Sequence, residues 1–241
     1  MPQRRAKDEA PANDVREHFA DLARTKVSFR IGSYRAEMIY WGVIGARYVL
    51  PVLTETGHHD TAVAVATQTT EPSWGYWTEK AGFTALGEHW PATTRSRNHH
   101  FFGAIVEWLY EDLAGIRPAS PGYGTIEFKP QIPAGGLDRV SASYDSMRGT
   151  IASSWQRSPT GLKLDVTVPA GAVGKVYVPA PSARVVSEVG AGRAIAAASA
   201  AGVRYVGVEG GRVVYEVGSG RYQFRVASGL VGEKQKAPRT R

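Results

Sequence analysis

Apolar residues recur at helical spacing from Tyr40 to about Ile116. Over Gly42–Glu55 this spacing predicts a helix with a kink at Pro51, because proline lacks the N–H that a helical hydrogen bond needs. Gly57 is expected to end this helix, and Asp60 to cap a second one. The second helix would carry the apolar residues Ala62, Val63, Val65 and Ala66.

A third helix has the clearest pattern in the chain. Its apolar residues recur at three- and four-residue steps, at Phe101, Phe102, Ile105, Val106, Leu109 and Leu113. Asn98 is expected to be its N-cap and Gly115 its end. Three or four helices offer too little partner surface to bury every apolar face, so we expect them to belong to a larger helical array.

After Pro121 short alternating apolar runs replace the helical pattern. Strands are predicted over Thr125–Lys129, Val140–Tyr144, Gly149–Trp155, Leu162–Val168, Lys175–Val178, Val203–Val208, Val213–Val217 and Tyr222–Val226. Glu209-Gly210-Gly211 joins two of these runs with residues that tolerate positive φ, as a tight hairpin requires. The alanine-rich stretch 194–201 is expected to be a loop. About eight strands, roughly 8–12 residues apart, favour an antiparallel β-sandwich.

These patterns divide the chain into four parts. Residues 1–35 show no periodicity and are taken as an unassigned N-terminal extension, and residues 36–117 as a helical domain. Residues 118–228 are assigned to the β-sandwich, and residues 229–241 to a basic tail without regular structure.

Charge and composition exclude several classes of partner. The net charge is +7, but six of the seven excess positive charges fall in residues 1–35 and 227–241, so no nucleic-acid partner is expected. There is no cysteine, which excludes disulfides and thiolate sites. His58 and His59 have no acidic cluster beside them, so no metal or other cofactor is expected. No apolar run reaches the roughly 18 residues of a membrane span, and without a signal-peptide pattern the compartment stays open.

The stretch from Gln68 to Phe102 is dense in groups that suit a sugar site. Three tryptophans with flat rings, Trp74, Trp77 and Trp90, alternate with polar residues. These polar residues are the carboxylates Glu71, Glu79 and Glu88 and the histidines His89 and His99. Sugar C–H faces stack on rings, hydroxyls need directed hydrogen bonds, and glycosidic cleavage needs two carboxyl groups. By composition alone, core packing of Trp74, Trp77 and Phe83 is the favoured interpretation.

Four segments carry a resemblance to a known family: GARYVLPVLTETGHHDTAVAVATQTTEPSWGYW, TALGEHW, RSRNHHFFGAIVEWLYEDLAGI and ASYDSMRGTIASSW. In order and spacing they resemble bacterial α-L-rhamnosidases, glycoside hydrolase family 78, over about two-thirds of the chain. The resemblance implies a multidomain α and β protein, in which the last helices of a partial (α/α)6 barrel precede an antiparallel β-sandwich. It also implies inverting hydrolysis of terminal non-reducing α-L-rhamnose, with rhamnose-containing glycosides or polysaccharides as partners.

The resemblance also carries over site residues. The family's proposed general base lies in a segment like T-T-x-W-E-x-W, and the matching residue is Glu88, which would deprotonate the attacking water. His99 matches a sugar-contacting histidine, and Trp74, Trp77 and Trp90 are candidates for the pocket walls. The alternatives are that Glu88 is an ordinary loop carboxylate and that His99 caps or packs beneath the third helix.

Two departures from the family pattern matter. Gly87 stands where the family has a tryptophan before the base. The family's general acid lies far upstream, and nothing in residues 1–35 matches it, so we expect this chain alone to be inactive or nearly so. Loss of proton transfer typically costs ~10²–10⁴-fold in rate. A missing N-terminal part of the same enzyme is the partner that this hypothesis implies.

Two further interpretations stay open. In one, the chain is a non-catalytic carbohydrate-binding module, with a sugar platform made by Trp155, Tyr144 or Tyr177 in the sandwich half. In the other, it is a structural partner that completes the barrel of another polypeptide.

Overall fold

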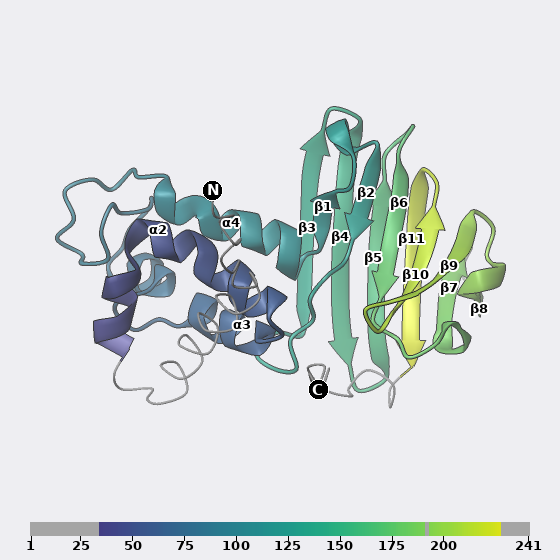
Figure 1. The fold of residues 1–241 in the computed structure, drawn as a ribbon, viewed down its shortest axis with the longest axis horizontal. Helices are drawn as coiled ribbons and strands as arrows, with labels where there is room; N and C mark the ends of the chain where they lie inside the picture. Colours follow the sequence, from purple (N-terminus) through teal and green to yellow (C-terminus); the bar gives the residue numbers. More distant parts are fainter. Residues whose placement is uncertain (1–33, 191–192, 228–241) are drawn as a thin grey trace, which may run out of the picture. The chain divides into compact units, whose positions relative to one another are not determined.

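The computed structural model describes residues 34–190 and 193–227 (Figure 1). The extension expected over 1–35, apart from its last two residues, and the tail expected over 229–241 lie outside the described residues. The chain forms two compact units, which divide between Ile105 and Val106. The domain limits given above stay predictions.

The first unit begins with helix α2 (Tyr34–Glu55). Pro51 lies inside this helix as expected, and the kink there stays a prediction, while the residue with non-helical angles is Gly42, at φ 46° and ψ −168°. Glycine tolerates positive φ, whereas proline keeps a helical φ and gives up a single hydrogen bond. At Gly57, with φ 82°, the helix ends as expected, and the N–H of His58 donates to the Leu53 carbonyl at 2.7 Å.

Helix α3 (His59–Thr67) follows directly and buries Ala62, Val63 and Val65. The expectation that Asp60 caps it was wrong, since His58 occupies the N-cap position without a capping side-chain hydrogen bond. Asp60 lies in the first turn instead, where a carboxylate faces the positive end of the helix dipole. A π-helical turn, η1 (Tyr76–Lys80), lies further along the same unit.

The third predicted helix is present with a changing pitch. It runs as a 3₁₀ turn η2 (Phe101–Gly103), helix α4 (Ala104–Trp108) and a π turn η3 (Leu109–Leu113). His100, not Asn98, is its N-cap. The change of pitch breaks the constant stripe that the sequence predicted, so Phe102 is buried while Phe101 is 50% exposed and Val106 is 48% exposed.

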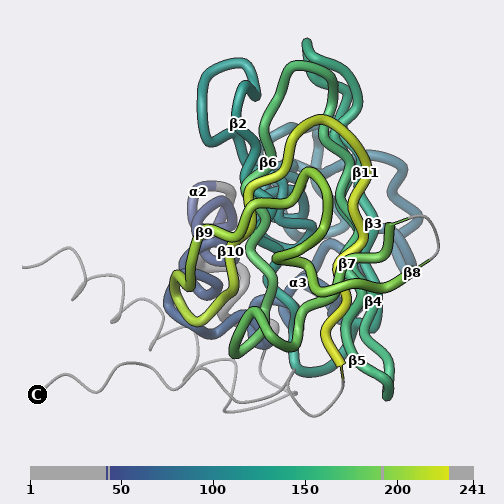
Figure 2. Tube along the Cα trace, turned by 90° about the vertical axis from the view of Figure 1, so that its right-hand side faces the viewer, coloured from purple at the N-terminus to yellow at the C-terminus, as the bar shows by residue number. Residues whose placement is uncertain are grey.

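The second unit is a β-sandwich of two sheets (Figure 1, Figure 2). One sheet has the order β1-β2-β6-β10-β9 and the other β3-β4-β5-β11-β7-β8. The strands are β1 (Ile116–Pro118), β2 (Thr125–Phe128), β3 (Arg139–Ser146), β4 (Gly149–Ser158), β5 (Gly161–Val168), β6 (Val173–Val178), β7 (Val186–Gly190), β8 (Arg193–Ala196), β9 (Val203–Glu209), β10 (Arg212–Val217) and β11 (Gly220–Ala227). Three 3₁₀ turns, η4 (Pro121–Tyr123), η5 (Ala183–Val185) and η6 (Ala197–Ser199), connect them.

All eight predicted strands are present, and the structure adds β1, β7 and β8. The stretch 194–201 is not only a loop, since β8 runs to Ala196 and η6 follows it. The β9–β10 hairpin turns at Gly210 and Gly211, with φ of 55° and 73°, as expected. Every pairing is antiparallel among the described strands except that of β2 with β6, which is parallel.

The core lies between the two sheets. Tyr215 of β10 and Phe224 of β11, from opposite sheets, stack with ring centroids 5.4 Å apart. A Cβ added at Gly174 of β6 would lie 2.8 Å from Cγ2 of Val168, which belongs to the other sheet. The sheets therefore approach too closely at this point for any side chain.

Strand β4 also holds the end of turn η3. The Ser153 hydroxyl donates to the Ala114 carbonyl at 2.7 Å, and the Trp155 indole N–H donates to the Leu113 carbonyl at 2.8 Å. Helix ends leave carbonyls without intrahelical partners, and here two strand side chains satisfy them. Gly115, with φ 75°, then turns the chain into β1 at a point where a Cβ would overlap the backbone of Pro130.

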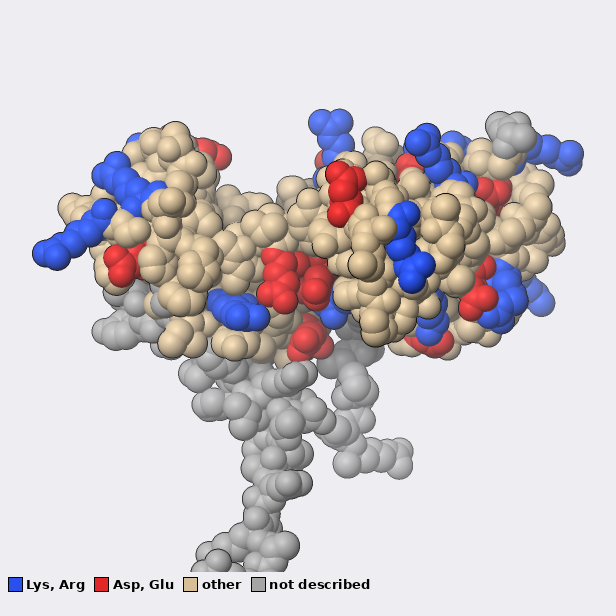
Figure 3. Space-filling view, turned by 90° about the horizontal axis from the view of Figure 1, so that it is seen from above, with Lys and Arg blue, Asp and Glu red and all other residues tan. Residues whose placement is uncertain are grey.

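Charged side chains of both signs are scattered on the face shown in Figure 3, which offers no continuous basic area. Among the described residues, no helix is long and apolar enough to cross a membrane. Within the same ranges, no three His, Asp or Glu side chains gather closely enough to hold a metal ion.

Candidate active-site loop

A cluster of aromatic rings forms the centre of the helical unit. Trp90 contacts three other rings, with centroid distances of 5.1 Å to Trp74, 4.9 Å to Trp77 and 4.2 Å to Phe102. Trp77 in turn stacks on Phe83 at 5.7 Å. Such tilted and offset arrangements are the favoured geometries of aromatic pairs, so the rings form a tightly packed core.

Hydrogen bonds tie this core to the backbone around the predicted site. The indole N–H of Trp74 donates to the Phe102 carbonyl at 3.0 Å, and that of Trp77 to the Trp90 carbonyl at 2.9 Å. Buried indole N–H groups generally find a partner, and here the partners lie at two positions around the loop that carries Glu88 and His99. The cluster therefore anchors this loop where it passes Trp90 and where it ends at Phe102.

The loop between Leu86 and His99 is closed by its own backbone. The N–H of His99 donates to the Leu86 carbonyl at 2.9 Å, and the N–H of Glu88 donates to the Ser96 carbonyl at 3.0 Å. Thr94 fills the inside, where its hydroxyl donates to the Ser96 carbonyl at 3.1 Å. These pairings bring Glu88 and His99, eleven positions apart in the sequence, to facing sides of one loop.

Both predicted polar site residues are partly accessible. The Glu88 and His99 side chains are half-buried, whereas His89 and His100 are exposed. The His99 ring packs against Phe101 with centroids 4.9 Å apart. Its Nδ1 atom is buried and has no hydrogen-bond partner among the described residues. His99 thus has a fixed ring and a nitrogen that has no hydrogen-bond partner within the described part of the chain.

The three residues predicted to form the pocket walls are more deeply buried than rings that stack on a sugar would be. Trp74, Trp77 and Trp90 are 7%, 0% and 3% exposed. A ring stacks on a sugar only through an open face, and these faces meet other rings. Within the described residues the indoles therefore form the packed core that composition alone favoured, and a contact with sugar stays a prediction.

Gly87, the departure from the family pattern beside Glu88, has a structural reason. A Cβ added there would lie 3.0 Å from Cγ2 of Thr94 and 3.2 Å from the Phe83 ring. The loop backbone and Thr94 occupy the space that a side chain at this position would need. The sequence shows the missing tryptophan, but nothing in it points to Thr94 as the residue that closes the loop.

Gly75 and Gln68 are two further residues of this unit that the sequence pattern did not indicate. A Cβ at Gly75 would lie 2.5 Å from the Gln68 carbonyl oxygen, so only glycine fits beside Trp74. The Gln68 Nε2 atom is buried without a hydrogen-bond partner among the described residues. A glycine between two aromatic residues is the only signal that could have indicated this close approach.

Comparison with protein families decides the identity of both units. Residues 17–113 match the bacterial alpha-L-rhamnosidase 6 hairpin glycosidase domain, and residues 115–193 match the bacterial alpha-L-rhamnosidase C-terminal domain. The chain belongs to the bacterial α-L-rhamnosidase family. The resemblance found in the sequence is therefore confirmed, and with it a partial helical barrel followed by a β-sandwich.

Curated rhamnosidases match part of the chain. An alpha-L-rhamnosidase of Streptomyces avermitilis is 35% identical over 149 residues, which cover 58% of this chain and 14% of that protein. One from Formosa agariphila is 34% identical over 148 residues, which cover 57% of this chain and 16% of that protein. The match thus spans about a seventh of the length of these relatives.

Solved rhamnosidase structures share the fold. The Streptomyces avermitilis alpha-L-rhamnosidase complexed with L-rhamnose has a TM-score of 0.66 and 32% identity, covering 77% of this chain and 18% of that one. The Dictyoglumus thermophilum alpha-L-rhamnosidase has a TM-score of 0.65 and 30% identity, covering 78% and 21%. The Aspergillus terreus alpha-L-rhamnosidase, at 21% identity and a TM-score of 0.64, shows the fold alone.

In the sandwich of this rhamnosidase-family chain, one of the three platform residues considered above is exposed to solvent. Trp155 is 1% exposed and Tyr177 is 5% exposed, so both belong to the interior, while Tyr144 is 41% exposed. The Tyr177 hydroxyl donates to Glu209, which also pairs with Lys175 at 3.0 Å. The hydrogen bonds from Lys175 and then Tyr177 hold the pKa of the Glu209 carboxyl below its usual value.

Proposed function

We propose that this chain forms part of an inverting α-L-rhamnosidase, in which Glu88 is the general base and His99 contacts the sugar. The observation that supports this most directly is the loop closed between Leu86 and His99. It holds the two residues that the family pattern assigns to the site on one anchored piece of backbone. The substrate would be a terminal, non-reducing α-L-rhamnose on a glycoside or polysaccharide.

In this proposal Glu88 removes a proton from the water that attacks the anomeric carbon. The water approaches opposite the leaving group, so the configuration inverts, and the two carboxyl groups stand roughly 6.5–9.5 Å apart to leave room for it. A half-buried position suits this role, because the carboxylate must reach substrate yet be shielded enough to act as a base. The bond from its own N–H to Ser96 fixes the backbone from which it extends.

His99 would orient the sugar by hydrogen bonding to a hydroxyl. Its ring is fixed by Phe101, and an imidazole can donate or accept according to its tautomer. The buried indoles would contribute indirectly, by keeping the loop that carries Glu88 and His99 rigid. Rigid support of this kind matters, because displacement of a catalytic group by about 1 Å can cost ~10²-fold in rate.

The catalytic pair needs a second carboxyl group, which we propose comes from a part of the enzyme that the 241 residues do not include. Without a general acid the leaving group departs unprotonated, and we expect hydrolysis by this chain alone to be ~10²–10⁴-fold slower than by a full-length relative. Ile44 and Tyr48, one turn apart on α2, are 76% and 54% exposed. They are apolar groups that further barrel helices would cover.

A chimaeric enzyme tests the assignment of Glu88. Residues 42–227 of this chain would replace the matching part of the Streptomyces avermitilis enzyme, and release of nitrophenol from an aryl α-L-rhamnoside would be measured. We expect activity in the chimaera and a ~10²–10⁴-fold lower kcat in its Glu88→Gln variant. Glu55→Gln is the matched control, since Glu55 is an exposed carboxylate in the same unit and lies outside the stretch from Gln68 to Phe102.

Full activity in the Glu88→Gln chimaera would remove Glu88 from the mechanism. The 241-residue chain is assayed beside it. Hydrolysis by that chain at the rate of a full-length relative would refute the expectation that the acid lies elsewhere.

A further inference from the structure

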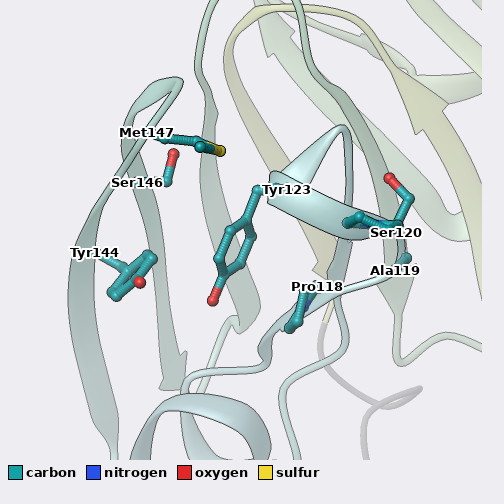
Figure 4. Close-up of a pocket in the computed structure, with 9 residues that line it drawn as sticks. Pro118, Ala119, Ser120, Tyr123, Tyr144, Ser146 and Met147 are labelled. Atoms are coloured by element: carbon teal, nitrogen blue, oxygen red, sulfur yellow. The ribbon is translucent and has the colours of Figure 1, made fainter.

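An open hollow of about 730 Å³ lies in the sandwich unit, between turn η4 and the tip of the β3–β4 hairpin (Figure 4). Its nine lining residues carry no charge: Pro118, Ala119, Ser120, Pro121, Gly122, Tyr123, Tyr144, Ser146 and Met147. In Figure 4 the Tyr123 and Tyr144 rings lie next to each other at the hollow, with Met147 above them. Its volume falls within the range of small-molecule sites, roughly 300–1,000 Å³.

Tyr123 and Tyr144, which line the hollow, belong to a row of three tyrosine rings. Tyr144 lies 5.1 Å from Tyr123 and 6.3 Å from Tyr110, measured between ring centroids. The Tyr110 hydroxyl donates to the Ser143 carbonyl at 3.1 Å, which braces the end of the row against β3. Tyr144 is 41% exposed and Met147 is 85% exposed, so the apolar surface is open to solvent.

The position of Tyr144 follows from the strand register. It pairs with Ile151 of β4, which is fully buried, so it belongs to the face of the sheet that builds the core. Yet Tyr144 stays exposed, because its edge strand β3 ends beside the hollow. A core-facing tyrosine that is open to solvent offers the ring face that the buried Trp155 and Tyr177 lack.

Turn η4, which carries Tyr123, is held in a strained conformation. Tyr123 has φ 55°, and among the described residues it is the one non-glycine residue with positive φ. A bulky residue there costs of order 1–3 kcal/mol and persists only where the surroundings impose it. Two bonds impose it here, one from the Arg148 guanidinium to the Gly122 carbonyl at 2.8 Å and one from the Thr125 N–H to the Ser120 hydroxyl at 2.7 Å.

The same contacts preform the hollow. Arg148 also donates to the Gly171 carbonyl at 3.2 Å, so the hairpin tip is fixed to two other segments. A Cβ at Gly122 would lie 2.9 Å from the Met147 sulfur, which shows how closely the two walls approach. Burial, and next the neighbouring Tyr144, raise the pKa of Tyr123, so its hydroxyl stays protonated and can donate a hydrogen bond.

We propose that this hollow, which we call the tyrosine groove, is a second carbohydrate site that binds a neutral pyranose of the substrate chain. The absence of charge from its lining residues favours a neutral ligand over a nucleic acid or an acidic peptide. Tyrosine faces and the Met147 side chain fit the C–H faces of a sugar, while the Tyr123 and Ser120 hydroxyls fit its hydroxyl groups. The identification of the bound sugar as a rhamnoside rests on the proposed function, whereas the proposal that the groove binds a neutral sugar does not.

The test is a titration of the full 241-residue chain, with Met147 as reporter. The chain has three methionines, so ¹³C-methyl methionine labelling gives a spectrum in which the Met147 signal can be assigned with a Met147→Leu variant. The ligands are methyl α-L-rhamnopyranoside, a rhamnose-containing oligosaccharide and a proline-rich peptide. We expect a saturable shift of the Met147 signal with the two sugars and none with the peptide.

Variants separate the groove from other sites. Tyr144→Ala should weaken sugar binding at least about tenfold, because loss of a central ring removes the main contact. Tyr144→Phe, which keeps the ring, should retain most of the affinity and guards against misfolding of the alanine variant. Tyr205→Ala is the matched control, since Tyr205 is a 44% exposed tyrosine on β9. Glu88→Gln should leave the Met147 shift unchanged. Failure of the proposal that Glu88 is the general base is therefore distinguishable from failure of the groove proposal.

Three results would overturn the proposal. The first is that neither sugar causes a saturable shift of the Met147 signal. The second is that the sugars shift this signal equally in Tyr144→Ala and in the parent. The third is that the peptide alone shifts it. The last would identify the groove as a site for extended proline-rich segments, which aromatic grooves also bind.

Discussion

Replacement of Ser153 by alanine should specifically loosen the junction between turn η3 and the sandwich. Ser153 is 1% exposed, and its hydroxyl donates to the carbonyl of Ala114, which is fully buried. Alanine removes this donor with almost no change of shape. Water cannot reach the Ala114 carbonyl to replace the lost bond, so the cost is that of a buried, unsatisfied acceptor.

The expected loss follows from that burial. Leaving a buried acceptor without its partner costs about 1–3 kcal/mol in the free energy of unfolding. For a unit of this size each kcal/mol lowers Tm by roughly 4 °C, so Ser153→Ala should lower it by roughly 4–12 °C. Ser154→Ala is the control, because its hydroxyl makes a longer 3.4 Å bond to Asp165 at a half-buried position. The control should stay within about 0.5 kcal/mol of the parent.

The assay is urea unfolding of each variant, followed by the circular dichroism of the sandwich strands, with a thermal melt beside it. The midpoint should fall for Ser153→Ala while the slope against urea stays constant, since the unfolded surface does not change. Equal midpoints for Ser153→Ala and Ser154→Ala would refute the argument that the Ala114 carbonyl depends on this donor.

Three further predictions concern other positions. Gly115→Ala should cost more than about 2 kcal/mol, because its Cβ would overlap Pro130 at a positive φ, whereas Gly135→Ala, with open space around it, should be neutral in the same urea assay. Trp77→Ala should cost about 3–5 kcal/mol in the helical unit, seen as loss of near-UV circular dichroism. Glu209→Gln should lower stability at neutral pH and low salt. Because the folded pKa of Glu209 is lowered, the difference from the parent should shrink and then vanish as the pH falls through that lowered pKa.

The strand pattern was predictable, and the partners of the strands were not. Alternation located β2 and β5 because their apolar residues face a core at every second position. It missed β7 and β8, where serine, glycine and alanine weaken the alternation. Nothing in a single strand's pattern shows whether its neighbour is parallel, so the pairing of β2 with β6 could only come from the structure.

For the site, the residues were predictable from the sequence, and the contacts that hold them in place were not. The family pattern pointed to Glu88 and His99, but the closure of their loop depends on backbone bonds and on Thr94, which leave no periodic signal. Composition could not distinguish a tryptophan that lines a pocket from one that fills a core, because both are apolar and aromatic. The caps failed for a related reason: a residue with good capping chemistry, such as Asn98, gives way where tertiary contacts set the start of the helix.

The parallel pairing of β2 with β6 has a consequence for the order in which the sandwich is built. Strands β1 and β2 leave the ribosome first, yet β2 borders β6, which is made only after the β3–β5 meander is complete. The meander is local and can form early, whereas the other sheet must wait for a distant partner. During synthesis, the edge of β2 that faces away from β1 therefore stays unpaired until β6 arrives, so a chain cut before β6 would leave the β1–β2 hairpin with an open edge.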